Sequence, residues 1–388
     1  MDKSIATKLV NVDPAPTEGF DSLCVPTYRG STITYPDYAS FAARGERPRA
    51  SYSYGLAGTP TTRTLQSKLT ELEGAEDTFL VSSGLMGITL SIMAVCEAGD
   101  TVLLPDNVYA PVRRFAAHAL SRFGIFARYY DPANPGATLE EPVDRLRMIW
   151  VEAPGSVTME IPDFSVVRAI ADKHGALLGC DNSWASPILC SPIALGADIV
   201  VEALTKYLSG HSDVLMGSIS VASEELAIKV HTCMRALGAG VSPDDCSLVL
   251  RGMASAVVRL QHVGDAALSL ARMAADWPSV AEVLHPALPS FPSHAHWKRQ
   301  FSGASGLFSI VLAEESERDF AARFETLRTF KIGASWGGTH SVLAPVVLDE
   351  ERTVDRKYAL RNILRVSVGL EDEASLREDL EMCLTRGR

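Results

Sequence analysis

Lys206 and Asp181 are the residues whose types and positions most strongly indicate chemistry. Lys206 follows the largely apolar run Ile199 to Leu204, where a hydrated lysine is not expected. Asp181 ends another apolar run and precedes Lys206 by about one strand-and-helix crossover. A lysine amine can form a Schiff base with an aldehyde cofactor, and a carboxylate beside a pyridine nitrogen keeps such a ring cationic. Simpler interpretations remain open, since Lys206 could extend to solvent and Asp181 could cap a turn with Asn182.

A third segment, Ser82 to Gly87, lies between the apolar run Phe79 to Val81 and a longer apolar segment that ends at Ala94. Small residues and the amides of a helix N-terminus can hold a phosphate at such a place. By itself the pattern is weak, because Ser-Gly turns are common between a strand and a helix. All three features would meet at the carboxyl edge of one sheet, where open α/β sheets bind their ligands.

The elements that must position these residues follow an α/β pattern from about residue 58 onward. Short apolar runs alternate with helical patterns, which is typical of a mostly parallel sheet with helices on both faces. The predicted strands lie at 79–81, 101–104, 148–151, 177–179 and 199–201, and the clearest predicted helices lie at 63–73, 164–174 and 223–237. These assignments place Asp181 and Lys206 just beyond two of the predicted strands.

Domain organisation follows from changes in this pattern along the chain. Residues 1–57 are weakly periodic and rich in Pro, Gly, Ser and Tyr, which predicts an extended arm rather than a domain. Residues 243–265 are predicted to connect to a second unit of α+β texture, with strands at 306–312 and 364–368 and helices at 318–327 and 373–384. We therefore predict an arm over 1–57, a main domain over 58–250 and a smaller C-terminal domain over 251–388.

Composition excludes several classes of protein. Of the 388 residues, 47% are hydrophobic and 21% charged, which suits packed cores in two or three domains. A net charge of −11 argues against nucleic acid as a partner. The longest apolar stretch, 87–96, is too short to span a membrane, and the first ten residues lack the apolar block of a secretory signal. Seven scattered cysteines without a C-x-x-C pair indicate reduced thiols, so we expect a cytoplasmic protein.

Other catalytic and binding motifs are absent or lack their context. Neither G-x-G-x-x-G nor G-x-x-x-x-G-K-[ST] occurs, which argues against NAD and ATP. Gly333 to Gly337 formally match the G-x-S-x-G elbow of hydrolases, but Pro345 follows soon after and no histidine lies beyond His340. His294 and His296 lie in a Pro-rich stretch without H-E-x-x-H spacing. We therefore expect neither a hydrolase triad nor a bound metal.

Several blocks, ordered along nearly the whole chain, resemble the Cys/Met metabolism family of pyridoxal-phosphate enzymes, and in particular its bacterial cystathionine β-lyases. The blocks are 53–59, 152–156, 181–185, 203–207 with 210–213, 285–289, 297–299, 335–338 and 365–372. This resemblance implies the fold of the PLP-dependent transferases of fold type I, a pyridoxal 5'-phosphate cofactor and an amino-acid substrate. It also implies a homotetramer built of two dimers, in which the arm reaches a neighbouring subunit.

The same resemblance implies roles for individual positions. Lys206 would hold the cofactor as a Schiff base and move the α-proton, and Asp181 would pair with the pyridine nitrogen. Tyr109 would be a second catalytic residue, which stacks on the ring, contacts the substrate and helps to deprotonate its incoming amine. The remaining contacts would come, for the cofactor, from Gly84, Leu85, Ser183 and Thr205, with Tyr54 of a neighbouring subunit, and, for the substrate, from Arg365 and Ser335.

Some positions depart from the family pattern. Leu56 stands where the arm usually has an arginine, so either the cofactor affinity falls or Arg47 or Arg49 supplies the missing cation. Ala334 stands where such β-lyases often have a tyrosine, which leaves the side-chain specificity open. Ala203 replaces a frequent serine, and Thr339 and His340 also differ from the pattern.

The resemblance predicts β-elimination from cystathionine or a related S-substituted cysteine, which gives a thiol, pyruvate and ammonia. A γ-lyase or γ-synthase acting on methionine or homoserine derivatives remains open, as does a cysteine or cysteine-conjugate lyase because of Ala334. A catalytically silent relative is the alternative from another class. The joint presence of Lys206, Asp181, Tyr109 and Arg365 disfavours that last alternative.

Overall fold

The computed structural model describes residues 4–11, 22–46, 49, 51–138, 143–313, 320–348 and 352–385. Its larger sheet has seven strands in the order β1-β7-β6-β5-β4-β2-β3. Strands β3, β2, β4, β5 and β6 run parallel, whereas β7 is antiparallel to both β6 and β1. The expected mostly parallel sheet is thus confirmed. The strands are β1 Asp77–Val81, β2 Thr101–Pro105, β3 Phe126–Tyr130, β4 Leu146–Glu152, β5 Leu177–Asp181, β6 Ile199–Glu202 and β7 Gly217–Val221.

Alternate side chains of these strands enter two different apolar cores, because successive residues of a strand point to opposite faces. In β2, Val102 and Leu104 pack with α4, α5 and α9 on one face, whereas Leu103 belongs to the core that includes α7. Helix α3 covers part of this second face, where its leucines cluster with Leu80. The bounds are α3 Pro60–Glu73, α4 Gly84–Val95, α5 Ala110–His118, α6 Pro135–Thr138, α7 Phe164–His174, α8 Ser186–Leu189 and α9 Glu224–Leu237.

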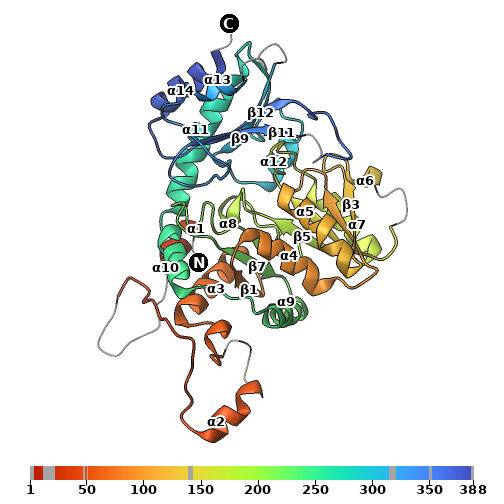
Figure 1. Ribbon diagram of the computed structural model, residues 1–388, viewed down its shortest axis with the longest axis vertical. Helices are drawn as coiled ribbons and strands as arrows, with labels where there is room; N and C mark the ends of the chain where they lie inside the picture. The colour runs from red at the N-terminus through yellow and green to blue at the C-terminus, as the bar shows by residue number, and fades with distance from the viewer. Residues whose placement is uncertain are drawn as a thin grey trace.

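A second, five-stranded sheet lies above the first in Figure 1, and the long helix α11 runs from one to the other. Its strand order is β10-β11-β12-β9-β8, and only the pair β10 and β11 is parallel. Apolar side chains of both units form one continuous core. The elements are α10 Pro243–Met253, α11 Ala256–Ala275, β8 Val280–Leu284, α12 His294–Gln300, β9 Leu307–Leu312, α13 Phe320–Phe324, β10 Lys331–Ile332, β11 Val342–Val347, β12 Asn362–Ser367 and α14 Glu373–Thr385.

Two details qualify the predicted organisation. The connection expected over 243–265 is helical, formed by α10 and the start of α11. Because α10 crosses residue 250, a domain boundary at that residue remains a prediction. Of the helix expected over 318–327, α13 covers Phe320–Phe324, and residues 318 and 319 lie outside the described part.

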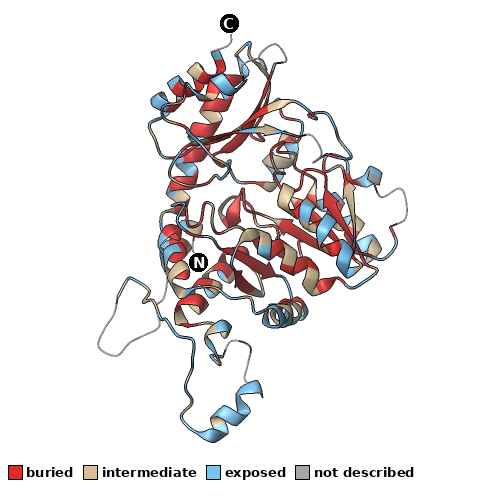
Figure 2. Ribbon diagram, in the orientation of Figure 1, coloured by how far each residue is buried: buried red, intermediate tan, exposed pale blue. Residues whose placement is uncertain are grey.

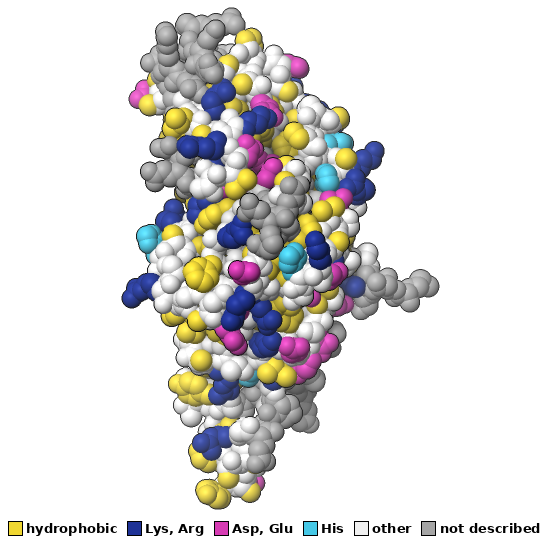
Figure 3. Space-filling view, turned by 90° about the vertical axis from the view of Figure 1, so that its right-hand side faces the viewer, with side chains coloured by type: hydrophobic (Ala, Val, Ile, Leu, Met, Phe, Trp, Pro, Cys, Tyr) yellow, Lys and Arg dark blue, Asp and Glu magenta, His cyan; other side chains and the backbone are white. Residues whose placement is uncertain are grey.

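The N-terminal region includes two short α-helices and two 3-10 turns: α1 Ile5–Val10, α2 Tyr38–Ala42, η1 Ala43–Glu46 and η2 Gly55–Ala57. Leu9 of α1 is buried in the cluster that contains Leu65 and Leu69 of α3. In contrast, α2 projects from the body of the molecule (Figure 1) and is exposed to solvent (Figure 2). Tyr38 is 83% exposed, and hydrophobic side chains gather at the tip of this arm (Figure 3).

The space-filling view shows basic and acidic side chains mixed over the visible face of the body (Figure 3). Among the described residues, no helix is both long enough and apolar enough to span a membrane.

Candidate active site

The two sheets enclose a cavity of about 200 Å³ at the carboxyl edge of the larger sheet. Asp181 ends β5, and Lys206 lies four residues beyond the end of β6. Both side chains line this cavity, as the spacing predicted. The predicted residues Gly84, Leu85, Tyr109, Ser183, Thr205 and Arg365 also line it, so the two sheets together bring most of the candidate site into one place.

The Lys206 side chain turns into the structure rather than out to solvent. Its Nζ donates a hydrogen bond to Ser335 Oγ at 3.0 Å and lies 4.7 Å from the centre of the Trp336 ring. Burial, and then the Arg365 charge, lower the pKa of this amine to about 8, against the Asp181 charge, which raises it. An amine with this pKa is available in its neutral form near physiological pH, and can act as a nucleophile or a base.

Asp181 is held in place by its neighbours. Its Oδ1 accepts a hydrogen bond from the Ser183 N–H at 2.9 Å, and Ser183 Oγ accepts one from the Ala203 N–H at 2.8 Å. Burial raises the pKa of Asp181, whereas hydrogen bonds from Ser183 and the charge of Lys206 lower it. A carboxylate in this position is stabilised by a cation opposite it, such as a protonated pyridine nitrogen.

Glu152 is a site residue to which the sequence assigned no role. It is the register partner of Asp181 on the neighbouring strand, and both residues line the cavity. Its Oε2 accepts a hydrogen bond from the Tyr109 N–H at 2.7 Å. Burial, and then the Asp181 charge, raise the pKa of Glu152 well above its usual range. Its place at the end of β4, within the block 152–156, was the signal that could have identified it.

Tyr109 is the N-cap residue of α5 and lines the cavity. Burial raises the pKa of its phenol, and the Glu152 carboxyl raises it further, whereas Arg365 opposes the shift. The preceding loop is fixed by the buried carboxylate of Asp106. That carboxylate accepts hydrogen bonds from the N–H groups of residues 353 to 355 and from Arg113. Sequence reasoning did not identify Asp106, whose partners lie far along the chain.

The start of α4 can hold a phosphate. Ser83 caps this helix by accepting a hydrogen bond from the Met86 N–H at 3.1 Å. The amides of Gly84 and Leu85 lie in the first turn, where amides have no partner within the helix. Gly84 packs against Ala203, since a Cβ on Gly84 would lie 2.6 Å from the Ala203 Cβ. This arrangement fits the phosphate of a cofactor whose aldehyde lies near Lys206.

Thr205 lines the cavity, but its hydroxyl is already paired. Its Oγ1 donates to the Met216 carbonyl at 3.1 Å and accepts from the Met216 N–H at 3.0 Å. A contact from this hydroxyl to a phosphate would have to compete with both bonds. The phosphate contact of Thr205 therefore remains a prediction.

The candidate substrate residues lie on the C-terminal side of the cavity. Arg365 is in β12, and its Nη2 donates a hydrogen bond to the Ala334 carbonyl at 2.5 Å. Burial lowers the pKa of this guanidinium, which remains charged because arginine is effectively always protonated. Ser335 contacts the amine of Lys206, and it is not among the residues that line the cavity.

Tyr54 lies away from the cavity of its own chain. It is 57% exposed and lines a separate hollow together with Phe79 and His231. Within one chain it therefore cannot contact a ligand beside Lys206. Its predicted role requires a second subunit, and that role remains a prediction.

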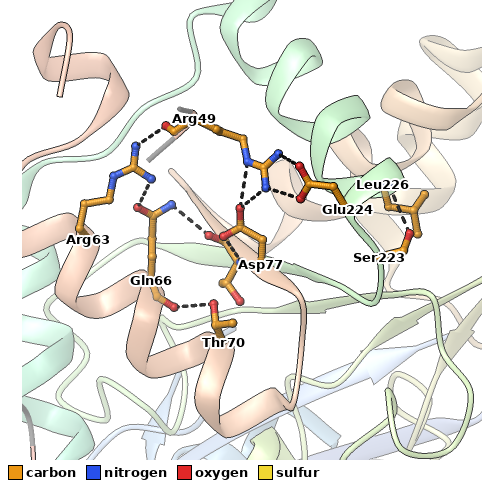
Figure 4. Close-up of polar contacts among 9 residues, drawn as sticks. Arg49, Arg63, Gln66, Thr70, Asp77, Ser223, Glu224 and Leu226 are labelled. Atoms are coloured by element: carbon orange, nitrogen blue, oxygen red, sulfur yellow. Dashed lines mark hydrogen bonds and ion pairs between the residues drawn. The ribbon is translucent and has the colours of Figure 1, made fainter. Parts of the chain in front are cut away.

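Arg49, one of two arginines suggested to replace the cation missing at Leu56, is engaged elsewhere (Figure 4). Its guanidinium binds both carboxylate oxygens of Glu224, at 3.0 and 2.8 Å, and Asp77 at 3.1 Å. Such a two-pronged contact is among the stronger polar interactions. Arg49 would have to break these bonds to reach a phosphate, and Arg47 lies outside the described residues.

The chain is similar to several known proteins. A family model described as Cys/Met metabolism PLP-dependent enzyme matches residues 6–385. Cystathionine beta-lyase of Bordetella avium is 34% identical, with 99% of this chain and 98% of that protein covered. An L-alanine/L-glutamate racemase of Wolbachia pipientis wMel is 35% identical, with 94% and 93% covered. A crystal structure of cystathionine gamma synthase from Xanthomonas oryzae pv. oryzae in complex with cystathionine has a TM-score of 0.90 and 28% identity, and covers 100% of this chain and 99% of that one.

Proposed function

Because the chain belongs to the Cys/Met metabolism family of pyridoxal-phosphate-dependent enzymes, we propose that it is a carbon-sulfur lyase that performs β-elimination on cystathionine or a related S-substituted cysteine. The observation that carries this proposal is the partly neutral amine of Lys206, in one cavity with Asp181 and Arg365. These side chains provide a base, a partner for the cofactor ring and a cation for the substrate carboxylate, which α-proton removal from an amino acid requires. The similarity to a cystathionine beta-lyase over nearly the whole chain also supports it.

The residues that would hold the cofactor are those of the sheet edge. Pyridoxal phosphate, when bound, supplies a cationic ring that withdraws electrons from the α-carbon of an attached amino acid. Lys206 would bind its aldehyde carbon, and Asp181 would face its ring nitrogen. The first-turn amides of Gly84 and Leu85 would hold its phosphate, and Tyr109 would cover one face of the ring.

The reaction then depends on two side chains. Arg365 would bind the substrate α-carboxylate through its planar guanidinium, which orients the α-hydrogen. Once the substrate amine has replaced the Lys206 amine at the aldehyde carbon, the released neutral amine of Lys206 would remove the α-proton. The bond between the β-carbon and sulfur would then break, with its electron pair leaving on sulfur. The proton held on Lys206 is then available to the departing thiolate. Addition of one water completes the conversion of the remaining fragment to pyruvate and ammonia.

The exposed arm favours an oligomer. The exposed aromatic residues Tyr38 and Phe41 lie on α2, which projects from the body of the molecule (Figure 1), and Tyr54 of the same arm is also exposed. Such exposed apolar groups favour an interface. We propose that this arm lies on a second copy and brings Tyr54 to its site, within a homotetramer of two dimers. A cytoplasmic location, suggested by the reduced-thiol pattern, is proposed with it.

Product analysis tests the proposed reaction. The purified protein, loaded with pyridoxal phosphate, is assayed with cystathionine, S-alkylcysteines, methionine and L-alanine. Pyruvate is expected as the keto acid, because it marks β-elimination. 2-Oxobutyrate as the main product would instead show γ-elimination. Interconversion of L- and D-alanine, without pyruvate formation from any substrate, would show that the protein is a racemase and not a lyase.

A further inference from the structure

Resting on the proposed lyase function, we propose that the preferred substrate has an uncharged, largely apolar group on its sulfur. Cystathionine has instead a second amino-acid head group, with one ammonium and one carboxylate, at that end. The two substrates make the same demands at the α-carbon. They differ only in what the far wall of the cavity must accommodate.

The charged side chains of the cavity are already assigned. The charged residue types among those lining it are Glu152, Asp181, Lys206 and Arg365. Lys206 and Asp181 are used by the cofactor, and Arg365 by the α-carboxylate. Glu152 already accepts the Tyr109 N–H, and burial raises its pKa, which favours the uncharged carboxyl. Among the described residues that line the cavity, no cation or carboxylate is left for a second head group.

Much of the remaining wall is apolar. Val157 and Met159 come from the loop after β4, Leu215 from the loop before β7, and Ala334 and Trp336 from the second sheet. Leu215 is 73% exposed, so an apolar side chain stands at the mouth of the cavity. Burial of an alkyl or aryl group against such a wall is favourable, because it removes apolar surface from water.

The described residues of the arm beside Tyr54 do not supply the missing charges. The proposed contact of Tyr54 with a neighbouring subunit would bring with it the following residues of η2, Gly55 to Ala57. These are a glycine, a leucine and an alanine, and Leu56 is 44% exposed. The nearby Arg49 is bound to Asp77 and Glu224. The neighbouring copy thus presents apolar surface beside its tyrosine.

The second amino-acid head group of cystathionine would therefore lose its hydration without gaining an oppositely charged partner. Burial of an unpaired polar or charged group is unfavourable by several kcal/mol. An apolar cavity distinguishes strongly against such a group, but only weakly between neutral groups that differ by one methylene. The structure thus predicts that kcat/KM depends strongly on the charge of the group on the sulfur and only weakly on its length.

A series of four cysteine derivatives with side groups of similar reach isolates the charge. S-propyl-L-cysteine is neutral, S-(2-carboxyethyl)-L-cysteine is anionic, S-(2-aminoethyl)-L-cysteine is cationic, and L-cystathionine has both charges. Pyruvate release by the loaded enzyme gives kcat/KM for each substrate. We expect the propyl derivative to exceed each of the other three by at least about tenfold. Calorimetric binding of the four compounds to the loaded Lys206→Ala variant should follow the same order.

The outcomes separate this inference from the proposed function. If no compound yields pyruvate, the lyase proposal itself fails. If cystathionine equals or exceeds the propyl derivative, the lyase proposal stands and the inference about the substituent is overturned.

A matched pair of variants tests where the substituent lies. Leu215→Asp and Leu215→Asn differ only in charge at an exposed position. The Asp variant should raise the ratio of kcat/KM for the aminoethyl over the propyl derivative several-fold above the ratio of the Asn variant. Equal ratios in the two variants would show that the substituent does not lie against this wall, which contradicts the proposed placement.

Discussion

The side-chain amine of Lys206 lies 3.0 Å from the hydroxyl oxygen of Ser335, although the two residues follow strands of different sheets. Lys206 comes from the loop after β6, and Ser335 from the segment between β10 and β11. The smaller sheet thus orients the amine that the larger sheet provides. The sequence placed Ser335 among the substrate contacts, whereas its observed partner is the lysine.

This contact predicts that Ser335→Ala lowers kcat more than it raises KM. Loss of the hydrogen bond leaves the amine less well oriented, and a bond of about 1.4 kcal/mol corresponds to roughly a tenfold fall in kcat. Steady-state kinetics with an S-alkylcysteine that the enzyme converts measure both constants. Ser335→Thr is the control variant that keeps the hydroxyl. A rise in KM alone would show that the serine binds the substrate, as its sequence context suggested.

Glu152 is predicted to act as a neutral acceptor for the Tyr109 amide. Burial raises the pKa of this carboxyl well above its usual range, which favours the uncharged form, and glutamine reproduces an uncharged acceptor. We expect Glu152→Gln to keep kcat/KM within about threefold. Glu152→Ala leaves the Tyr109 amide without its acceptor and should lower kcat/KM by roughly 10 to 100-fold. Equal losses in the two variants would instead point to an ionised carboxylate at this position.

Leu56→Arg is predicted to tighten cofactor binding. The arm lacks the arginine usual in the family, and Arg49 is bound to Asp77 and Glu224 (Figure 4). A new ion pair with the phosphate of about 1 kcal/mol would lower the dissociation constant of pyridoxal phosphate roughly fivefold. Equilibrium dialysis measures this constant, with Leu56→Gln as the uncharged control. Unchanged affinity would mean that residue 56 does not reach the phosphate.

A pair of buried carboxyls behind the site predicts a pH-dependent stability. Glu202 and Glu73 are each 1% exposed, and among the described residues no hydrogen-bond partner is present for either Glu202 oxygen or for Glu73 Oε2. Glu202 shares its register row with Ser218 and Leu80, on the face covered by α3, whose last residue is Glu73. Burial raises the pKa of Glu73 to about 8 and that of Glu202 well above its usual range.

These carboxyls bind protons more tightly in the folded than in the unfolded chain. The free energy of unfolding should therefore fall as pH rises from the unfolded pKa, near 4.3, to about 8, by about 1.4 kcal/mol per pH unit for each proton retained. Glu202→Gln removes one titrating group, so the slope should become shallower. Urea unfolding from pH 5 to 9 measures the slope. Glu378→Gln, at an exposed position of α14, should leave the slope unchanged, and an equal slope in Glu202→Gln would contradict the prediction.

Much of the larger sheet could be predicted, because its strands are apolar runs between helical patterns. Strands β3 and β7 were missed, and the sequence of β7 shows why. Ser218 and Ser220 are buried, and Ser220 pairs with Thr78 across the sheet at 2.8 Å. Gly217 is required because a Cβ there would lie 2.5 Å from the Ser83 carbonyl oxygen. Buried serines paired across strands leave no apolar pattern to detect.

The site was predictable where it depends on strand ends and not where it depends on long-range contacts. Asp181 and Lys206 were identified because each follows an apolar run. The anchoring of the Tyr109 loop by Asp106 depends on N–H groups of residues 353 to 355, and no local pattern encodes that meeting. The pairing of Arg49 with Glu224 is likewise a contact between distant segments.

Borohydride reduction followed by peptide mass mapping is the decisive experiment. The purified protein is incubated with pyridoxal phosphate, reduced with sodium borohydride and digested, and the modified lysine is located. One cofactor mass is expected on Lys206, and Lys206→Ala protein should remain unmodified and inactive. Stable modification of a different lysine, or full turnover by Lys206→Ala, would contradict the role assigned to this amine.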